Sequence, residues 1–191
     1  MLRTRFSRAL DVLPPVRMYR AASRTSPLAV AFATCYIKGS ASDALAQLQL
    51  EKKPKIDWRR NIAFATFSGA YAGVAQHYIY NIIFSRAFGT ATDLATATRK
   101  VAADSFLHVP LFCLPIYYPF ETIMLGQGGV VDGWRRYRDD AYDVLTTYWT
   151  IWPPVHALNF TLMPTEMRIS VVACMSFVWL IYLSHKSHRE S

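Results

Sequence analysis

The sequence predicts an all-α fold, an integral membrane bundle of four to five transmembrane helices with kinked, proline-containing segments. Hydrophobic residues make up 52% of the 191 residues and charged residues 18%, which is less charge than a soluble domain usually carries. Apolar stretches follow one another in series, and each has at least the about 20 residues that cross ~30 Å of hydrocarbon. The charged residues gather between these stretches. This separation of charge from apolar sequence is what favours a membrane protein.

A basic segment, residues 1–25, precedes the first stretch. An Arg-rich, acid-poor amino terminus is typical of mitochondrial targeting. The alternative is a basic amphipathic helix that lies on the membrane surface as an anchor. The arginines are Arg3, Arg5, Arg8, Arg17, Arg20 and Arg24, against the single acid Asp11. We expect residues 26–186 to form a single transmembrane helical domain and residues 187–191 to form a polar tail.

The first stretch covers about residues 27–50. Pro27 suits a first helical turn, where its missing N–H leaves no hydrogen bond unmade. The stretch is weakly hydrophobic because it contains Lys38, Asp43 and Gln47. A charged loop follows it.

The second stretch covers about residues 58–84, and Asp57 is its expected N-cap. Within it, Gly69 and Gly73 are four residues apart and share one helix face, which allows another helix to approach closely. His77 falls on the same face. We interpret the two glycines as a packing element and His77 as either a hydrogen-bonding group or part of a polar path.

The third stretch, about residues 94–125, contains three prolines, Pro110, Pro115 and Pro119. Prolines at this density kink or interrupt a helix, and membranes tolerate them where neighbouring groups satisfy the freed carbonyls. A glycine-rich loop, residues 126–129, ends the stretch. It lacks the Gly-Lys-Ser/Thr ending of a phosphate loop, so we interpret it as a hinge.

The fourth stretch covers about residues 133–163, begins with charged residues and becomes aromatic, and Pro153 and Pro154 are expected to bend it. Pro164 then introduces the fifth stretch, about residues 165–184, the most apolar of all. With five crossings, Lys and Arg divide equally between the two sides, so the positive-inside rule favours neither orientation.

Polar and ionisable residues inside the apolar stretches are the sharpest functional clue. An Asp costs at least about 2.5 kcal/mol at a bilayer centre, so Asp43 and Asp104 should face the bundle interior. Two interpretations stay open: a polar path for a solute or ion, and pairing across helices that fixes the packing. Lys38 is a candidate partner for Asp43. The candidate polar path or interhelical network is Lys38, Asp43, Gln47, His77, Asp104, His156 and Asn159.

Other functional classes lack support in the sequence. The basic residues fall in short clusters at the ends of the stretches, which indicates contact with anionic lipid headgroups rather than with nucleic acid. Each cysteine, Cys35, Cys113 and Cys174, sits inside an apolar stretch, and none has a His at zinc-ligand spacing. There are no paired carboxylates, no nucleophile elbow and no phosphate loop. We therefore expect neither an enzyme nor a bound metal or cofactor.

Four sequence elements occur in a recognisable order over about residues 19–186. They are Asp43 with Gln47; then Asp57, Arg60, Gly69, Gly73, His77 and Tyr80; then Lys100, Asp104 and Pro110; and last Trp149, Trp152, Pro153, Asn159, Phe160, Pro164, Arg168 and Trp179. Together they resemble the Mpv-seventeen and twenty-two-kilodalton peroxisomal membrane protein family. Among the departures, Ser105 and His156 stand where that family usually carries Gln.

The resemblance implies a protein of the mitochondrial inner membrane, with the peroxisomal membrane as the alternative location. It also implies channel-like passage of a solute and a role in membrane homeostasis. The alternative function is a non-catalytic structural or accessory subunit of a larger inner-membrane complex, for example a respiratory or ATP synthase complex. Its partners would then be other membrane subunits as well as lipids.

Overall fold

The computed structural model describes residues 12–187, with side chains up to Phe177. Residues 1–11, the last four residues and the side chain of Trp179 lie outside this description. The described chain divides into two compact units. Unit 1 comprises Met1–Ala87 with Leu162–Ser191, and unit 2 comprises Phe88–Thr161. The described residues are almost entirely helical, which confirms the all-α prediction.

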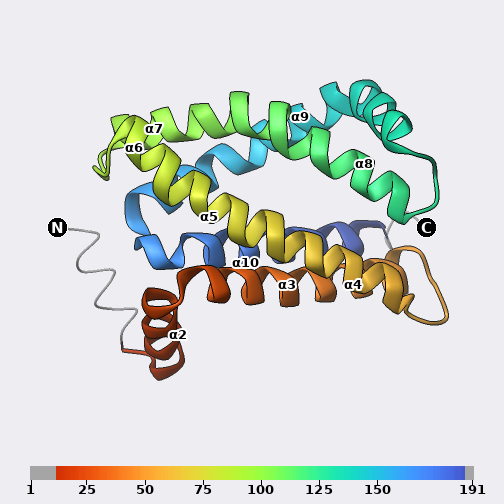
Figure 1. Ribbon diagram of the computed structural model, residues 1–191, viewed down its shortest axis with the longest axis horizontal. Coiled ribbons are helices and arrows are strands. Elements are labelled where there is room, and N and C mark those ends of the chain that lie inside the picture. Colours follow the sequence, from red (N-terminus) through yellow and green to blue (C-terminus); the bar gives the residue numbers. More distant parts are fainter. Residues whose placement is uncertain (1–11, 188–191) are drawn as a thin grey trace. The chain divides into compact units, whose positions relative to one another are not determined.

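Unit 1 is built from long helices (Figure 1). Several of them contain π-helical segments. Its elements are α2 Pro14–Thr25; α3 Pro27–Leu45 with the π-helix η1 Ala46–Leu50; α4 Trp58–Phe67, η2 Ser68–Ala75, α5 Gln76–Tyr78, η3 Ile79–Ile83 and α6 Phe84–Phe88; and the 3₁₀ turn η5 Thr165–Met167 with α10 Arg168–Ser187. These bounds follow the predicted stretches closely. The predicted N-cap is confirmed, because the Asp57 side chain accepts a hydrogen bond from the backbone N–H of Arg60.

The centre of unit 1 is helix α3, which packs against α4, η2 and α10. Glycines allow the close approach. A Cβ added to Gly73 would lie 2.6 Å from the carbonyl oxygen of Ala31, and one added to Gly69 would lie 2.8 Å from the Phe32 ring. A third glycine, Gly39 on α3 itself, faces Ser68 in the same way, at 2.6 Å. The two glycines singled out from the sequence therefore lie at the contact with α3.

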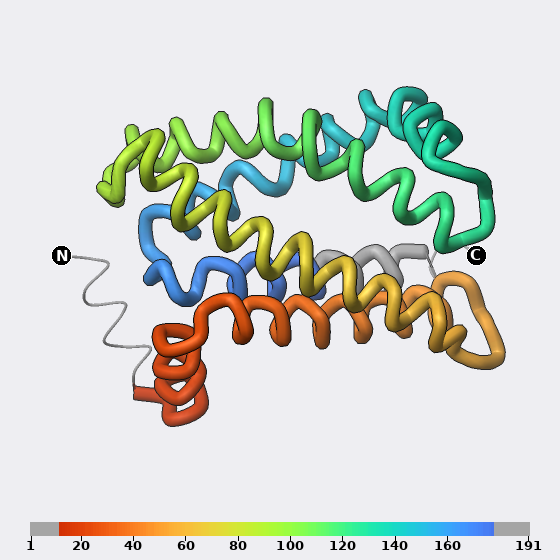
Figure 2. Tube along the Cα trace, viewed as in Figure 1, coloured from red at the N-terminus to blue at the C-terminus, as the bar shows by residue number. Residues whose placement is uncertain are grey.

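Unit 2 consists of two long helical runs. The first comprises α7 Leu94–Ala103, the π-helix η4 Asp104–Cys113 and α8 Leu114–Met124, and the second is α9 Val130–Leu162. The first run continues through all three of its prolines without a break (Figure 2). Among the described residues, the run Leu94–Met124 is the one stretch that is both long and apolar enough to cross a membrane.

The three prolines of this run leave carbonyls unbonded, and aromatic donors from α9 bond each of them. Pro110 lies in the π-helix η4, where each N–H bonds the carbonyl five residues earlier. Because proline has no N–H, the Ser105 carbonyl lacks this bond. It accepts a hydrogen bond from Trp149 Nε1 instead, at 3.0 Å. The Tyr137 hydroxyl donates to the Pro110 carbonyl, five residues before Pro115, at 2.8 Å. Trp134 Nε1 donates to the Pro115 carbonyl, four residues before Pro119, at 3.0 Å. Neighbouring donors thus make the prolines compatible with a continuous helix. The sequence predicted a kink or an interruption, and the interruption does not occur.

Burial in the described residues is inverted relative to a soluble protein. More polar and charged residues than apolar residues are fully buried, while many large apolar side chains are exposed. In the run Leu94–Met124, Asp104 is 0% exposed whereas Leu111 is 59% and Phe112 is 58% exposed. Water would not tolerate such an apolar surface, but lipid matches it.

Candidate functional site

The most buried ionisable group of unit 2 is Asp104, at the start of η4. Its carboxylate oxygens lie near three side chains. Nδ1 of His108, one turn further along the helix, lies 2.8 Å from Oδ1. The Tyr148 hydroxyl of α9 donates to Oδ2 at 2.5 Å, and Nε2 of His156 lies 3.5 Å from the same oxygen. Because these groups come from both helical runs, Asp104 fastens α9 to η4.

The α9 side of this cluster is a ladder of rings four residues apart. Tyr148 stacks on Trp152 with 6.0 Å between ring centroids, and Trp152 stacks on His156 at 5.6 Å. His156 stacks in turn on Phe160 at 6.0 Å. Lys100, which is 1% exposed, holds its ammonium 5.9 Å from the centroid of the Phe160 ring, a cation–π distance. Asn159, 0% exposed, lies beside the ladder on the same helix.

We call Lys100, Asp104, His108, Tyr148 and His156 the polar file. The first three follow one another at four-residue intervals along one helix face, so they form a row rather than a point. A carboxylate, two imidazoles and a phenol are groups that accept and donate protons. In the described part of the chain no three His, Cys, Asp or Glu side chains are placed to bind a metal ion. The groups of the polar file are suited to proton exchange and hydrogen bonding.

A second polar network joins the end of α3 to the start of α4 in unit 1. Oδ1 of Asp43, a residue 6% exposed, accepts from Arg60 Nε at 2.9 Å. Its Oδ2 accepts from Gln47 at 2.7 Å and from Asn61 at 3.2 Å. The sequence offered Lys38 as the partner of Asp43; the structure corrects this, since the cation paired with Asp43 is Arg60.

The same arginine also reaches the loop after η1. Arg60 donates two hydrogen bonds to the carboxylate of Glu51, at 2.8 and 2.7 Å. These bonds are the main reason that the pKa of Glu51 is lowered to about 2. Gln47 bonds the backbone of Asp57 through both ends of its amide, accepting at 2.7 Å and donating at 3.3 Å. Every polar group in this network has a partner, so its geometry suits a fixed helix–helix joint.

Lys38 occupies a different environment. It lines an outward-opening, mostly apolar groove between α3 and α10, together with Thr34, Ile37, Ala173 and Cys174 among others. Ile37 at the rim is 68% exposed. The structure therefore separates Lys38 from the Asp43 network with which it was grouped.

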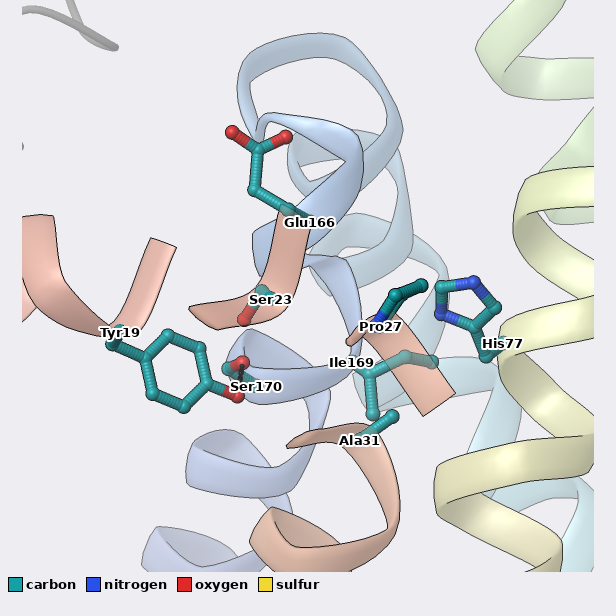
Figure 3. Close-up of a pocket in the computed structure, with 8 residues that line it drawn as sticks. All are labelled: Tyr19, Ser23, Pro27, Ala31, His77, Glu166, Ile169 and Ser170. Carbon is teal, nitrogen blue, oxygen red and sulfur yellow. Dashed lines mark hydrogen bonds between the residues drawn. The ribbon is translucent and has the colours of Figure 1, made fainter. Parts of the chain in front are cut away.

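Helix α2, the described part of the basic segment, packs against α3 and η5. Arg20, 2% exposed, and Arg24 both donate to Oε1 of Glu166, at 3.1 and 2.7 Å through their Nη2 atoms. Burial raises the pKa of Glu166, but hydrogen bonds from its own backbone N–H and from the two arginines outweigh it, and the net pKa is lowered. The Tyr19 hydroxyl hydrogen-bonds Ser170 of α10 (Figure 3).

A small cavity lies beneath this contact, and Figure 3 shows Tyr19, Ser23 and His77 among the side chains around it. The centre of a water molecule can occupy only about 10 Å³ of this cavity, so the cavity holds at most one water. The described part of unit 1 therefore has no solute-sized chamber at this position.

The remaining residues singled out from the sequence lie at helix contacts. His77 exchanges a hydrogen bond with Asn81 at 3.2 Å, while Tyr80 is 1% exposed and packs on Phe84. Arg168 donates to Oδ1 of Asn81 at 3.4 Å. Pro164 is the N-cap residue of η5. Pro153 lies inside α9, which runs through it without a break.

Sequence reasoning missed several residues that hold these sites together. His108 lies one turn after Asp104, and that spacing was a signal that could have found it. Tyr148 and Asn61 carry no such local signal, because their partners lie on other helices. Gly133 was also missed; a Cβ there would lie 2.3 Å from the backbone of Pro119, so it sets the closeness of α9 to α8.

Comparison with known proteins gives relatives along most of the chain. It is 27% identical to the mitochondrial inner membrane protein Mpv17 of Rattus norvegicus over 175 residues, which is 91% of this chain and 97% of that protein. It is 26% identical to Mpv17 of Homo sapiens over the same length. It is 30% identical to protein sym1 of Aspergillus oryzae over 170 residues, 88% of this chain and 95% of that protein.

A family model described as the Mpv17 / PMP22 family matches residues 123–184. No solved structure gives a significant match. The names of the Mpv17 relatives bear out the inner-membrane location predicted from the sequence. The sequence resemblance is confirmed as well, over nearly the full length of the chain. The chain belongs to the Mpv17 / PMP22 family and is a membrane protein of the mitochondrial inner membrane.

Proposed function

We propose that the chain is a multi-pass protein with a channel-like role, in which the polar file of unit 2 forms the path for protons or a small polar solute. The observation that carries this proposal is a row of buried ionisable groups inside Leu94–Met124, the run that, among the described residues, is long and apolar enough to cross a membrane. Ionisable groups are costly at that depth, and Lys100, Asp104 and His108 occupy it together. Apolar side chains of similar size would pack unit 2 without that cost.

The helix lengths support four to five crossings. The run Pro27–Leu50 extends about 36 Å at 1.5 Å per residue, and α10, with 20 residues, extends about 30 Å. Both match the ~30 Å hydrocarbon thickness. The polar side chains of Pro27–Leu50 include Lys38 and Asp43, and Asp43 is buried among the helices of unit 1.

The polar file is closed in the described conformation, since Asp104 is in contact with His108, Tyr148 and His156. Passage would proceed by separation of Asp104 from Tyr148, which exposes a carboxylate and two imidazoles to a shared aqueous space. Because those groups exchange protons, a proton or a small hydrogen-bonding solute is the class that fits. Basic clusters at the helix ends, including Arg59 and Lys55, would hold anionic headgroups and fix the depth of the bundle.

Proton and solute flux in proteoliposomes tests the proposal. Purified wild-type protein should accelerate dissipation of an imposed pH gradient or efflux of small polar solutes. Asp104→Asn, which keeps the shape but removes the charge, should change the rate or its pH dependence. Lys52→Gln, which removes a charge from the exposed loop after η1, is the control and should behave as wild type. Flux equal to that of empty liposomes for all three proteins would remove the channel-like role.

A second function is favoured by the Asp43 network. Its side chains are mutually bonded at a helix joint, which is the arrangement expected of a non-catalytic structural or accessory subunit. The chain would then hold a larger inner-membrane assembly together, and neither proposal assigns it a catalytic step. Native gels of mitochondria in mild detergent distinguish this role: migration at monomer size with no co-migrating protein would count against it.

A further inference from the structure

The hydrogen bonds between the two runs of unit 2 fix which residues share the same depth. Trp149 bonds Ser105, Tyr137 bonds Pro110 and Trp134 bonds Pro115. As the number on α9 falls, the number on the other run rises, so the two runs are antiparallel. The first half of α9 therefore lies beside the most apolar part of Leu94–Met124.

That first half of α9 bears a charged outer face. Arg135 and Arg138 have side chains 66% and 76% exposed, and Asp139 has a side chain 63% exposed. Tyr142 on the same face is 79% exposed. We call this set, Asp132, Arg135, Arg138, Asp139, Tyr142 and Asp143, the α9 charged face.

The exposed face of Leu94–Met124 and the α9 charged face lie at the same depth but suit different surroundings. Leu111 and Phe112 are more than half exposed and Ile116 is 47% exposed, so this part of the run suits hydrocarbon. The α9 charged face is level with them and does not suit hydrocarbon, because charged side chains in a bilayer face protein or water. If Leu94–Met124 crosses the membrane, which is part of the proposed function, this face needs a cover other than lipid.

We propose that the cover is the α9 charged face of a second copy of the chain, packed antiparallel about a two-fold axis. A two-fold interface sets one surface against itself, so the surface must be self-complementary. An axis midway between Arg138 and Asp139 places Arg138 of one copy against Asp139 of the other. It also sets Arg135 against Tyr142, a cation–π pairing. The order of Arg135, Arg138, Asp139 and Tyr142 along α9 is the order that this alignment requires.

Charge-swap variants test the pairing between copies. Arg138→Asp makes the middle of the face acidic, and Asp139→Arg makes it basic, so each variant repels itself and attracts the other. With the two variants co-expressed under different tags in mitochondria, mixed dimers should exceed like-with-like dimers by roughly fivefold, the ratio expected for two exposed charge pairs. Wild-type copies carrying two tags should co-purify without preference. The charge pairs within one chain cannot produce a mixed preference, which makes the readout specific to contact between copies.

A labelling experiment separates failure of this inference from failure of the crossing on which it rests. In a variant with its cysteines replaced by alanine, Leu111→Cys should resist a membrane-impermeant maleimide, whereas Lys53→Cys in the loop after η1 should react. Ready labelling of Leu111→Cys would overturn both the crossing and the dimer. Protection of Leu111→Cys with random recovery of the tagged variants, or with no co-purification at all, would overturn the dimer and leave the crossing intact.

Discussion

Removing the Tyr137 hydroxyl is predicted to destabilise unit 2 through a backbone carbonyl that loses its donor. The hydroxyl donates to the Pro110 carbonyl at 2.8 Å, and Pro115 has no N–H to replace it. Tyr137→Phe keeps the ring, whose centroid lies 5.4 Å from that of Tyr118. An unsatisfied buried carbonyl costs about 1–3 kcal/mol. Since Tyr137 is partly exposed, we expect the lower part of that range, about 1–2 kcal/mol.

The measurement is unfolding in detergent micelles by titration with a denaturing detergent, followed by circular dichroism. Pro115→Ala supplies an N–H five residues after Pro110, in the register of η4, so in that background the hydroxyl should be redundant. Tyr137→Phe should then cost less than about 0.5 kcal/mol, giving a coupling energy near 1 kcal/mol. An equal cost in both backgrounds, or no cost in the wild type, would refute the assignment of Tyr137 as the donor for a proline-freed carbonyl.

Three further predictions concern unit 1. Gly73→Ala should destabilise the packing of η2 on α3 by about 1–3 kcal/mol, because its Cβ meets the backbone of α3. Gly129→Ala, whose Cβ would make only an ordinary contact with Asp132 at 3.9 Å, should be neutral in the same unfolding titration. Glu166→Gln should loosen α2 and speed tryptic cleavage after Arg20, and unchanged cleavage would contradict the docking. The lowered pKa of Glu51 means that its bond with Arg60 stabilises the fold above the unfolded pKa of about 4.5 and is lost as pH falls toward about 2. Wild type should therefore lose stability between pH 5 and 3 more steeply than Glu51→Gln, and parallel pH curves would exclude the bond.

Helix positions were largely predictable because apolar runs, Pro27 and capping aspartates act locally. Asp57 caps the helix that follows it, as its position in the sequence indicated, and Asp93 caps α7 in the same way. The continuity of Leu94–Met124 was not predictable, since it depends on donors from α9. Three prolines indicate a break when the helix is considered alone, and Trp134 and Tyr137 remove the cause of the break.

Partners of buried charges were predictable in type but not in identity. The cost of Asp43 in an apolar stretch indicated a buried partner, and Lys38 was the candidate on the same helix. The structure uses Arg60 from the next helix, because the guanidinium can bond Asp43 and Glu51 together. For Asp104 the local signal of His108 was available, whereas Tyr148 and His156 depend on the packing of α9.

The central claim, that Leu94–Met124 crosses the bilayer with its apolar face in lipid and Asp104 turned inward, is tested most directly by spin-label accessibility in proteoliposomes. A nitroxide at Leu111→Cys should be reached readily by molecular oxygen and poorly by a polar nickel complex, as expected in hydrocarbon. A nitroxide at Lys53→Cys should show the reverse. Equal access of the nickel complex to both labels would contradict the account, because Leu111 would then face water.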